Sequence, residues 1–178
     1  MTTELTITEG LKRLKLLQKR MVRNCEDIER YSSLLSNEKP AFDTEGKQRA
    51  EVASLIQANI DLEKEYCKLK AMIDYTNLVT IVQIDDEIRT VHSWLTLLRA
   101  TGKNLINTYR SLSTKEAHTR LVRFASNKEN SPTITQLYDE NEKRTGLRKW
   151  EDLTSGKIIE GRLEVINATT KLLDPPKV

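Results

Sequence analysis

The fold is decided by the stretch "VASLIQANIDLEKEYCKLKAMI", which runs from Val52 to Ile73. One set of its residues recurs in alternating steps of three and four: Val52, Leu55, Asn59, Leu62, Tyr66, Leu69 and Ile73. Such a repeat places its members on one side of an α-helix and is typical of coiled coils. We therefore predict a long helix over about residues 48–76.

A similar repeat lies upstream and predicts a helix over about residues 7–36. Its apolar residues recur every seven positions: Ile7, Leu14, Met21, Ile28 and Leu35. Thr6 or Thr8 can cap the start of this helix, since a threonine hydroxyl accepts from a free backbone N–H. The connection to the next helix is short and contains Pro40 and Gly46, so the two helices should be antiparallel neighbours.

The register of this helical hairpin can be estimated from its loop. If the turn is centred near residue 42, Asn24 lies opposite the region of Asn59, and the two amides could meet across the hairpin. A polar residue in an apolar seam can fix register; the alternative is that Asn24 borders the seam and faces water. The same geometry separates Cys25 from Cys67 by roughly 12 Å along the axis, so we expect no disulfide.

A β-forming run, "LVTIVQI", interrupts the helical pattern at residues 78–84. Five of its seven residues are β-branched, and such residues prefer extended backbone. We predict a short strand that pairs with residues 119–126, with residues 131–138, or with a neighbouring subunit. Pro132 restricts its own segment to a sheet edge or a strand start.

Two further helices complete the prediction. A third repeat predicts a helix over about residues 86–113, with Asp85 or Asp86 as its N-cap. Apolar spacing in the tail predicts a last helix over residues 155–173. The expected fold class is mainly α, a single elongated domain over residues 1–178. It consists of a long antiparallel helical hairpin and a third long helix in a coiled-coil-like bundle, with a small β element and a C-terminal helix.

The composition argues against an enzyme with a large buried centre. Of the 178 residues, 38% are hydrophobic and 31% are charged, with a net charge of +3. The chain has two cysteines, Cys25 and Cys67, and two histidines, His92 and His118. Their spacing matches no metal-binding or catalytic motif. We predict no catalytic, cofactor-binding or metal-binding residues, no cofactor and no membrane partner. Without an apolar signal core, the expected location is the cytoplasm, or a virion if the gene belongs to a phage.

Several apolar residues fall outside the main repeats, so a two-helix hairpin leaves them uncovered. Either the rest of the chain or another subunit must bury them. We predict that they form the interface of a homo-oligomer: Leu16, Leu17, Ile56, Ile60, Trp94 and Leu97.

A basic segment over residues 113–150 offers a different function. Its cations are interleaved with Phe124, Tyr138 and Trp150, and such a mixture can bind single-stranded nucleic acid through phosphate contacts and base stacking. Acidic residues interrupt the run, as they often do in solvated loops. The candidate contacts include Lys128, Lys143 and Lys149, but above all four arginines: Arg120, Arg123, Arg144 and Arg148.

Two fragments resemble the septicolysin-like family of unknown function, found in bacteria and phages. They are "IDYTNLVTIV" at residues 73–82 and "LEVINATTKLLD" at residues 163–174. The order of elements is also similar over most of the chain, whereas residues 113–150 are longer and more polar than the family pattern. The resemblance implies the mainly helical fold and brings no catalytic residues.

These observations favour a non-enzymatic structural or assembly protein that acts as a homo-oligomer, with other structural proteins as further partners. A phage virion component, such as a capsid or tail accessory protein, is the specific form we expect. The alternative is a nucleic-acid-binding accessory protein that uses the basic segment.

Overall fold

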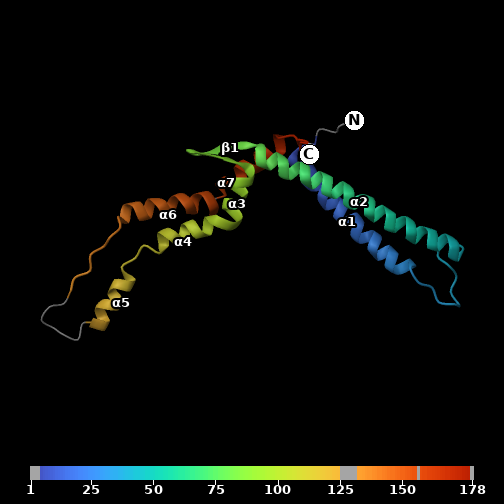
Figure 1. Ribbon diagram of the computed structural model, residues 1–178, viewed down its shortest axis with the longest axis horizontal. Helices are drawn as coiled ribbons and strands as arrows, with labels where there is room; N and C mark the ends of the chain where they lie inside the picture. The colour runs from blue at the N-terminus through green and yellow to red at the C-terminus, as the bar shows by residue number, and fades with distance from the viewer. Residues whose placement is uncertain (1–4, 125–131, 156, 177–178) are drawn as a thin grey trace. The chain divides into compact units, whose positions relative to one another are not determined.

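The computed structural model describes residues 5–124, 132–155 and 157–176, and its fold is mainly helical, as predicted (Figure 1). The sequence suggested a single domain, but contacts within the chain gather into two compact units. The first unit runs as far as Thr80 and includes the chain from Val165 onward, and the second is Ile81–Glu164.

The first unit is built on two long antiparallel helices, α1 (Ile7–Tyr31) and α2 (Glu45–Val79), which lie side by side (Figure 1). Thr6 caps α1 as predicted. Its hydroxyl accepts from the Glu9 backbone N–H at 3.3 Å, and the Glu9 carboxylate accepts from the Thr6 backbone N–H at 2.8 Å. The reciprocal bonds satisfy two donors that a helix start otherwise leaves free.

The bounds of both helices differ from the prediction by a few residues. Helix α1 ends at Tyr31 instead of residue 36, because the serines that follow are weak helix formers. Helix α2 begins earlier than predicted because Thr44 caps it, with the Thr44 hydroxyl accepting from the Lys47 backbone N–H at 3.2 Å. It continues to Val79, three residues beyond the predicted end, and Thr76 in its last turn is fully buried.

The core of the hairpin lies near the start of α1 and the end of α2. Its buried residues form one cluster: Ile7, Leu14, Leu17, Leu69 and Ile73. The C-terminal segment is bonded to the same end. The Leu172 N–H donates to the Leu5 carbonyl at 2.8 Å, and the Leu173 N–H donates to the hydroxyl of the buried Thr76 at 2.9 Å.

The predicted register of the hairpin is confirmed by a bond between two seam amides. Asn24 Nδ2 donates to Asn59 Oδ1 at 2.9 Å, and Asn59 Nδ2 donates in turn to the Met21 carbonyl at 3.3 Å. Cys25 and Cys67 are free, as their predicted separation requires.

The second unit opens with a β-hairpin of β1 (Ile81–Ile84) and β2 (Glu87–Thr90). The extended backbone predicted at 78–84 is therefore present in its later part, and its partner within the chain is β2, which the sequence did not predict. Asp85 and Asp86 form the two-residue turn instead of a helix N-cap. Asp85 adopts a positive φ of 51°, which aspartate tolerates better than most residues.

The third predicted helix is divided into α3 (Val91–Thr96), a π-helical turn η1 (Leu97–Thr101) and α4 (Gly102–Arg110). Thr90 caps it, with its hydroxyl accepting from the Ser93 N–H at 3.2 Å. The helix starts five residues later than predicted because β2 takes the preceding segment.

Three helices follow: α5 (Lys115–Phe124), α6 (Glu140–Ser155) and α7 (Ile158–Thr169). The strand predicted at 119–126 is wrong, because residues up to 124 belong to α5. Residues 132–138 form no strand either, and β1 pairs with β2 instead. Positions 125, 126 and 131 of these predictions lie outside the described residues.

Helix α6, which the sequence did not predict, packs beside α4 (Figure 1). Gly146 allows the close approach, because a Cβ there would overlap the ring of Tyr109. The buried apolar residues of this unit are Val82, Ile84, Val91, Trp94, Leu97, Ile106, Leu153, Ile159 and Leu163. The last helix is shorter than the predicted 155–173, because α6 continues to Ser155.

Candidate interaction surface

Half of the predicted oligomer interface is buried inside the chain. Leu17 belongs to the core of the helical hairpin, and Trp94 and Leu97 belong to the core of the second unit. Trp94 Nε1 donates to the Val82 carbonyl at 2.9 Å, so even its polar atom is satisfied internally. These three residues cannot contact another subunit, and that part of the prediction is wrong.

The other three predicted residues are exposed in the single chain, and residues of a subunit interface must be exposed before the subunits associate. The exposed fractions are 49% for Leu16, 48% for Ile56 and 45% for Ile60. Ile56 and Ile60 are one helical turn apart on α2 and therefore adjoin on its surface. Val22 on α1, which is not among the predicted interface residues, is still more exposed, at 59%.

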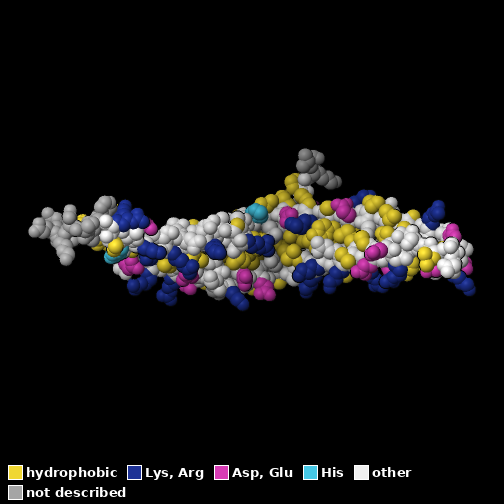
Figure 2. Space-filling view, turned by 90° about the horizontal axis from the view of Figure 1, so that it is seen from below, with side chains coloured by type: hydrophobic (Ala, Val, Ile, Leu, Met, Phe, Trp, Pro, Cys, Tyr) yellow, Lys and Arg dark blue, Asp and Glu magenta, His cyan; other side chains and the backbone are white. Residues whose placement is uncertain are grey.

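Val22, Ile56 and Ile60 lie on the same side of the helical hairpin, here called the apolar side. On α2, Ile56 is three residues before Asn59, so the two lie on the same side of that helix. On α1, Val22 is likewise three residues before Cys25 and lies on the same side as Cys25. Asn59 Nδ2 lies 3.4 Å from Cys25 Sγ, which places these two sides next to each other. Figure 2 shows hydrophobic side chains among the charged ones over α1 and α2.

Leu16 lies on the other side, where charges dominate. It is three residues from Arg13 and four from Arg20, and Arg13 Nε donates to Glu65 Oε1 at 2.9 Å. A shallow groove between the helices on this side is lined mostly by polar and charged residues: Arg20, Arg23, Asn24, Asp27, Ala58, Asp61, Leu62 and Glu65. The predicted interface residues therefore do not form one patch.

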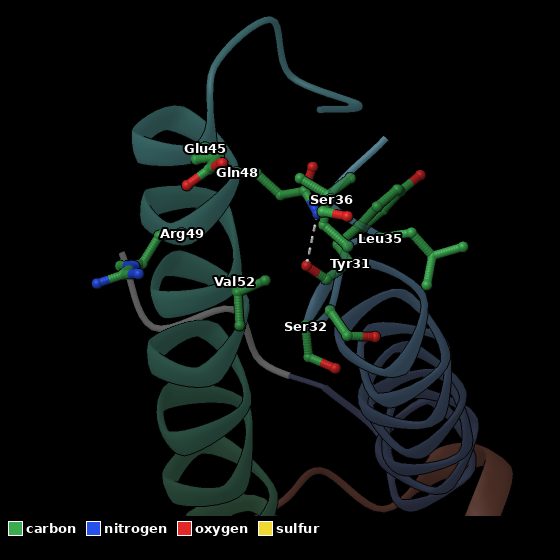
Figure 3. A pocket seen from close by; sticks show the side chains of 10 residues that line it. Tyr31, Ser32, Leu35, Ser36, Glu45, Gln48, Arg49 and Val52 are labelled. Atoms are coloured by element: carbon green, nitrogen blue, oxygen red, sulfur yellow. Dashed lines mark hydrogen bonds between the residues drawn. The ribbon is translucent and has the colours of Figure 1, made fainter. Parts of the chain in front are cut away.

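At the loop end of the hairpin, a recess of about 310 Å³ separates the end of α1 from the start of α2 (Figure 3). Buried Gln48 lines it and joins the end of α1 to the loop. Its Nε2 donates to the Tyr31 carbonyl at 2.9 Å, and its Oε1 accepts from the Ala41 N–H at 2.8 Å. The sequence carried a signal for Gln48, which is four residues before Val52 and so continues the seam.

Cys67 lies along the same side of α2 as Ile60, seven residues further along. Its thiol donates to Glu63 Oε1 at 3.0 Å. This hydrogen bond, together with desolvation and the negative charge of Glu63, raises the pKa of the Cys67 thiol above its ordinary value. The thiol therefore reacts less readily than its exposure alone would suggest.

In the second unit, Glu87 connects the β-hairpin to α6. Lys149 Nζ donates to Glu87 Oε1 at 2.7 Å, and Arg89 Nε donates to Glu87 Oε2 at 2.9 Å. The bond from Lys149 is the largest of the effects that lower the pKa of Glu87. Arg89 also lies over the ring of Trp94, 5.2 Å from its centroid. The sequence gave no signal for this network, because its members come from three separate elements.

The basic segment is divided among α5, α6 and the chain before α6, and Lys128 lies outside the described residues. Tyr138 and Trp150 already have cations over their rings. Lys143 Nζ is 5.3 Å from the ring centroid of Tyr138, and Lys149 Nζ is 4.9 Å from that of Trp150. The bond from Lys149 to Glu87 further reduces the free positive charge. These contacts leave less free positive charge for phosphates, and less free ring surface for bases, than the sequence suggested.

Among the described residues, no group of three or more histidine, cysteine, aspartate or glutamate side chains is placed to hold a metal ion. None of the described helices has the length and apolar character that a membrane span requires. Comparisons with protein families, curated proteins and solved structures found no match.

Proposed function

We propose that the protein is a non-enzymatic assembly protein that acts as a homo-oligomer. The observation that carries this proposal is the apolar side, where Val22, Ile56 and Ile60 are exposed next to one seam of the hairpin. Burying an aliphatic side chain of this size contributes about 1.5–3 kcal/mol. Covering three on each of two subunits would supply a substantial part of a stable association.

The helices that carry these side chains support the proposal because they are well fixed. Caps define the starts of α1 and α2, an apolar cluster holds one end, and seam amides hold the middle. A rigid surface loses little conformational entropy on association. A structural component of a phage virion is the specific form of assembly that we propose.

The experiment replaces Ile56 and Ile60 by glutamate and measures the native mass by light scattering. We expect the unaltered protein to be a defined oligomer and the double variant to be a folded monomer, with its helices verified by circular dichroism. Leu16→Glu is the matched control, because Leu16 is equally exposed but lies on the charged side. The proposal fails if the unaltered protein is a monomer, or if only the Leu16 variant dissociates.

Nucleic-acid binding remains the second candidate. It is favoured by Arg120 and Arg123, which are exposed three residues apart on α5 and form no ion pair within the described parts of the chain. Neutralising these two together with Arg144 and Arg148 should abolish any salt-sensitive binding to a single-stranded oligonucleotide and leave assembly unchanged. Binding that survives these substitutions would exclude the basic segment as its site.

A further inference from the structure

Helix α1 carries a line of exposed residues on its outer surface. Its members follow steps of four and three and are all exposed: Lys15, Lys19, Val22, Glu26 and Glu29. This set, here called the outer stripe, is separate from the inward residues of α1 that pack on α2. When such charged positions face a further helix, they can set its orientation through interhelical ion pairs.

Charge is segregated along the outer stripe. Lys15 and Lys19 precede Val22, whereas Glu26 and Glu29 follow it. Within the described residues, none of these four side chains forms an ion pair with another residue of the chain. One half of the stripe is thus basic and the other half acidic, and the apolar residue is at the centre.

We propose that a second copy of the chain docks antiparallel on the outer stripe, with Val22 close to a two-fold axis. This proposal rests on the proposed function and specifies the surface through which two subunits of the homo-oligomer associate. Reversal about Val22 places Lys15 opposite Glu29 of the partner subunit and Lys19 next to Glu26 of the partner subunit. The two-fold operation repeats both pairs, because the same surface is used twice.

The charges select this orientation over the parallel one. In a parallel pair each lysine would face the same lysine of the second copy, and like charges opposed at an interface disfavour association. In the antiparallel pair every charge of the stripe meets one of opposite sign. Electrostatic complementarity of this kind fixes register and orientation more than it raises affinity.

Helix α2 supplies apolar area at the same level. Because Asn24 pairs with Asn59 in an antiparallel hairpin, Val22 lies level with the region of Ile60. Ile56 follows one turn away, on the same side. The proposed axis therefore passes near the centre of the apolar side. The charged stripe and the exposed aliphatic residues become two parts of one contact.

The test uses two charge variants of the full chain. Lys15→Glu/Lys19→Glu makes the stripe wholly acidic, and Glu26→Lys/Glu29→Lys makes it wholly basic. Each alone should raise the dissociation constant about tenfold or more, since attractive pairs become repulsive ones. An equimolar mixture should associate again as a heterodimer, and a chain with all four substitutions should associate like the unaltered protein.

A matched control changes the same number of charges on the other side of α1. Arg13→Glu/Arg20→Glu should leave the dissociation constant within about twofold of the unaltered value, because exposed charges away from a contact have small effects. Circular dichroism of each variant verifies that the helices form.

Three results separate the possibilities. If either charge variant associates as tightly as the unaltered chain, or if mixing restores nothing, the antiparallel contact is wrong. If, in addition, Ile56→Glu/Ile60→Glu still dissociates the oligomer, the proposed function stands without this geometry. A monomeric unaltered protein would overturn both.

Discussion

Asn24 donates a hydrogen bond to Asn59 across the helical hairpin, at 2.9 Å from nitrogen to oxygen. Asn59 uses its own amide N–H₂ for the Met21 carbonyl and lies beside Cys25 Sγ. Sliding either helix by one heptad would separate the two amides and leave them without these partners in a half-buried seam. The pair therefore fixes which residues of α1 and α2 face each other, and so which ones remain exposed.

Asn59→Ala should lower the free energy of unfolding by about 1–3 kcal/mol, because it leaves the partly buried Asn24 amide without its acceptor. Replacing both asparagines by leucine should largely restore stability, since an apolar pair fits the seam. Urea unfolding followed by circular dichroism measures both. Equal stability of Asn59→Ala and the unaltered protein would show that the bond contributes nothing.

Trp94→Ala should lower the stability of the second unit by about 3–5 kcal/mol, as expected for a large buried aromatic residue. Because Trp94 lies inside its own unit, the native mass should not change. Thermal unfolding and light scattering test the two halves of this prediction. If the variant keeps the unfolding temperature of the unaltered protein but has a lower native mass, Trp94 lies at the subunit interface and this prediction is wrong.

The stability of the second unit should fall in acid through Glu87. Lys149, assisted by Arg89, lowers the pKa of Glu87 below its ordinary value of 4.5. A carboxyl group with a lowered folded-state pKa stabilises the fold above its unfolded-state pKa, and this stabilisation is lost as the pH falls through the folded value. Glu87→Gln should be less stable than the unaltered protein at neutral pH. The difference should shrink below about pH 4.

Cys67 should react faster when Glu63 is changed to glutamine. The carboxylate accepts the thiol proton and raises the pKa of Cys67, so its removal should lower that pKa and increase the thiolate fraction at neutral pH. Alkylation by iodoacetamide, quantified for each cysteine by peptide mass, measures the rates. Cys25 serves as the internal reference, and an unchanged ratio of the two rates would contradict the assignment.

The sequence predicted the hairpin because each of its signals is local and periodic. The seam from Val52 to Ile73 defines the inner side of α2, and the loop length defines the register to within a residue. Thr6 as a cap followed from its position before the repeat. Where the evidence lies within one helix or one short loop, the sequence was sufficient.

The second unit was predicted less well because its pattern is ambiguous. Ile88 matches the spacing of a helix but lies in β2, where the turn at Asp85 reverses the chain. The β-branched Val122 suggested a strand, whereas its neighbours form the helix α5. Helix α6 was not predicted, and Gly146 is the residue that lets it approach Tyr109.

The candidate surface was predicted only in part, because periodicity does not tell an uncovered residue from one covered by a distant segment. Leu17 and Leu97 lie outside the simplest repeats but are buried, and Leu17 clusters with Leu69 and Ile73 of α2. Ile56 and Ile60 remained exposed as expected. Val22 was missed because a single valine between charged residues carries no pattern until the outer stripe is considered as a whole.

The most direct test of the assembly proposal is the native mass of the unaltered chain over a range of concentrations. Sedimentation equilibrium gives this mass without reference to molecular shape. We predict a mass that is an integer multiple of one chain, that is held to micromolar concentration, and that shifts toward one chain at high salt as the stripe charges are screened. A mass of one chain at every concentration and salt would contradict the proposal.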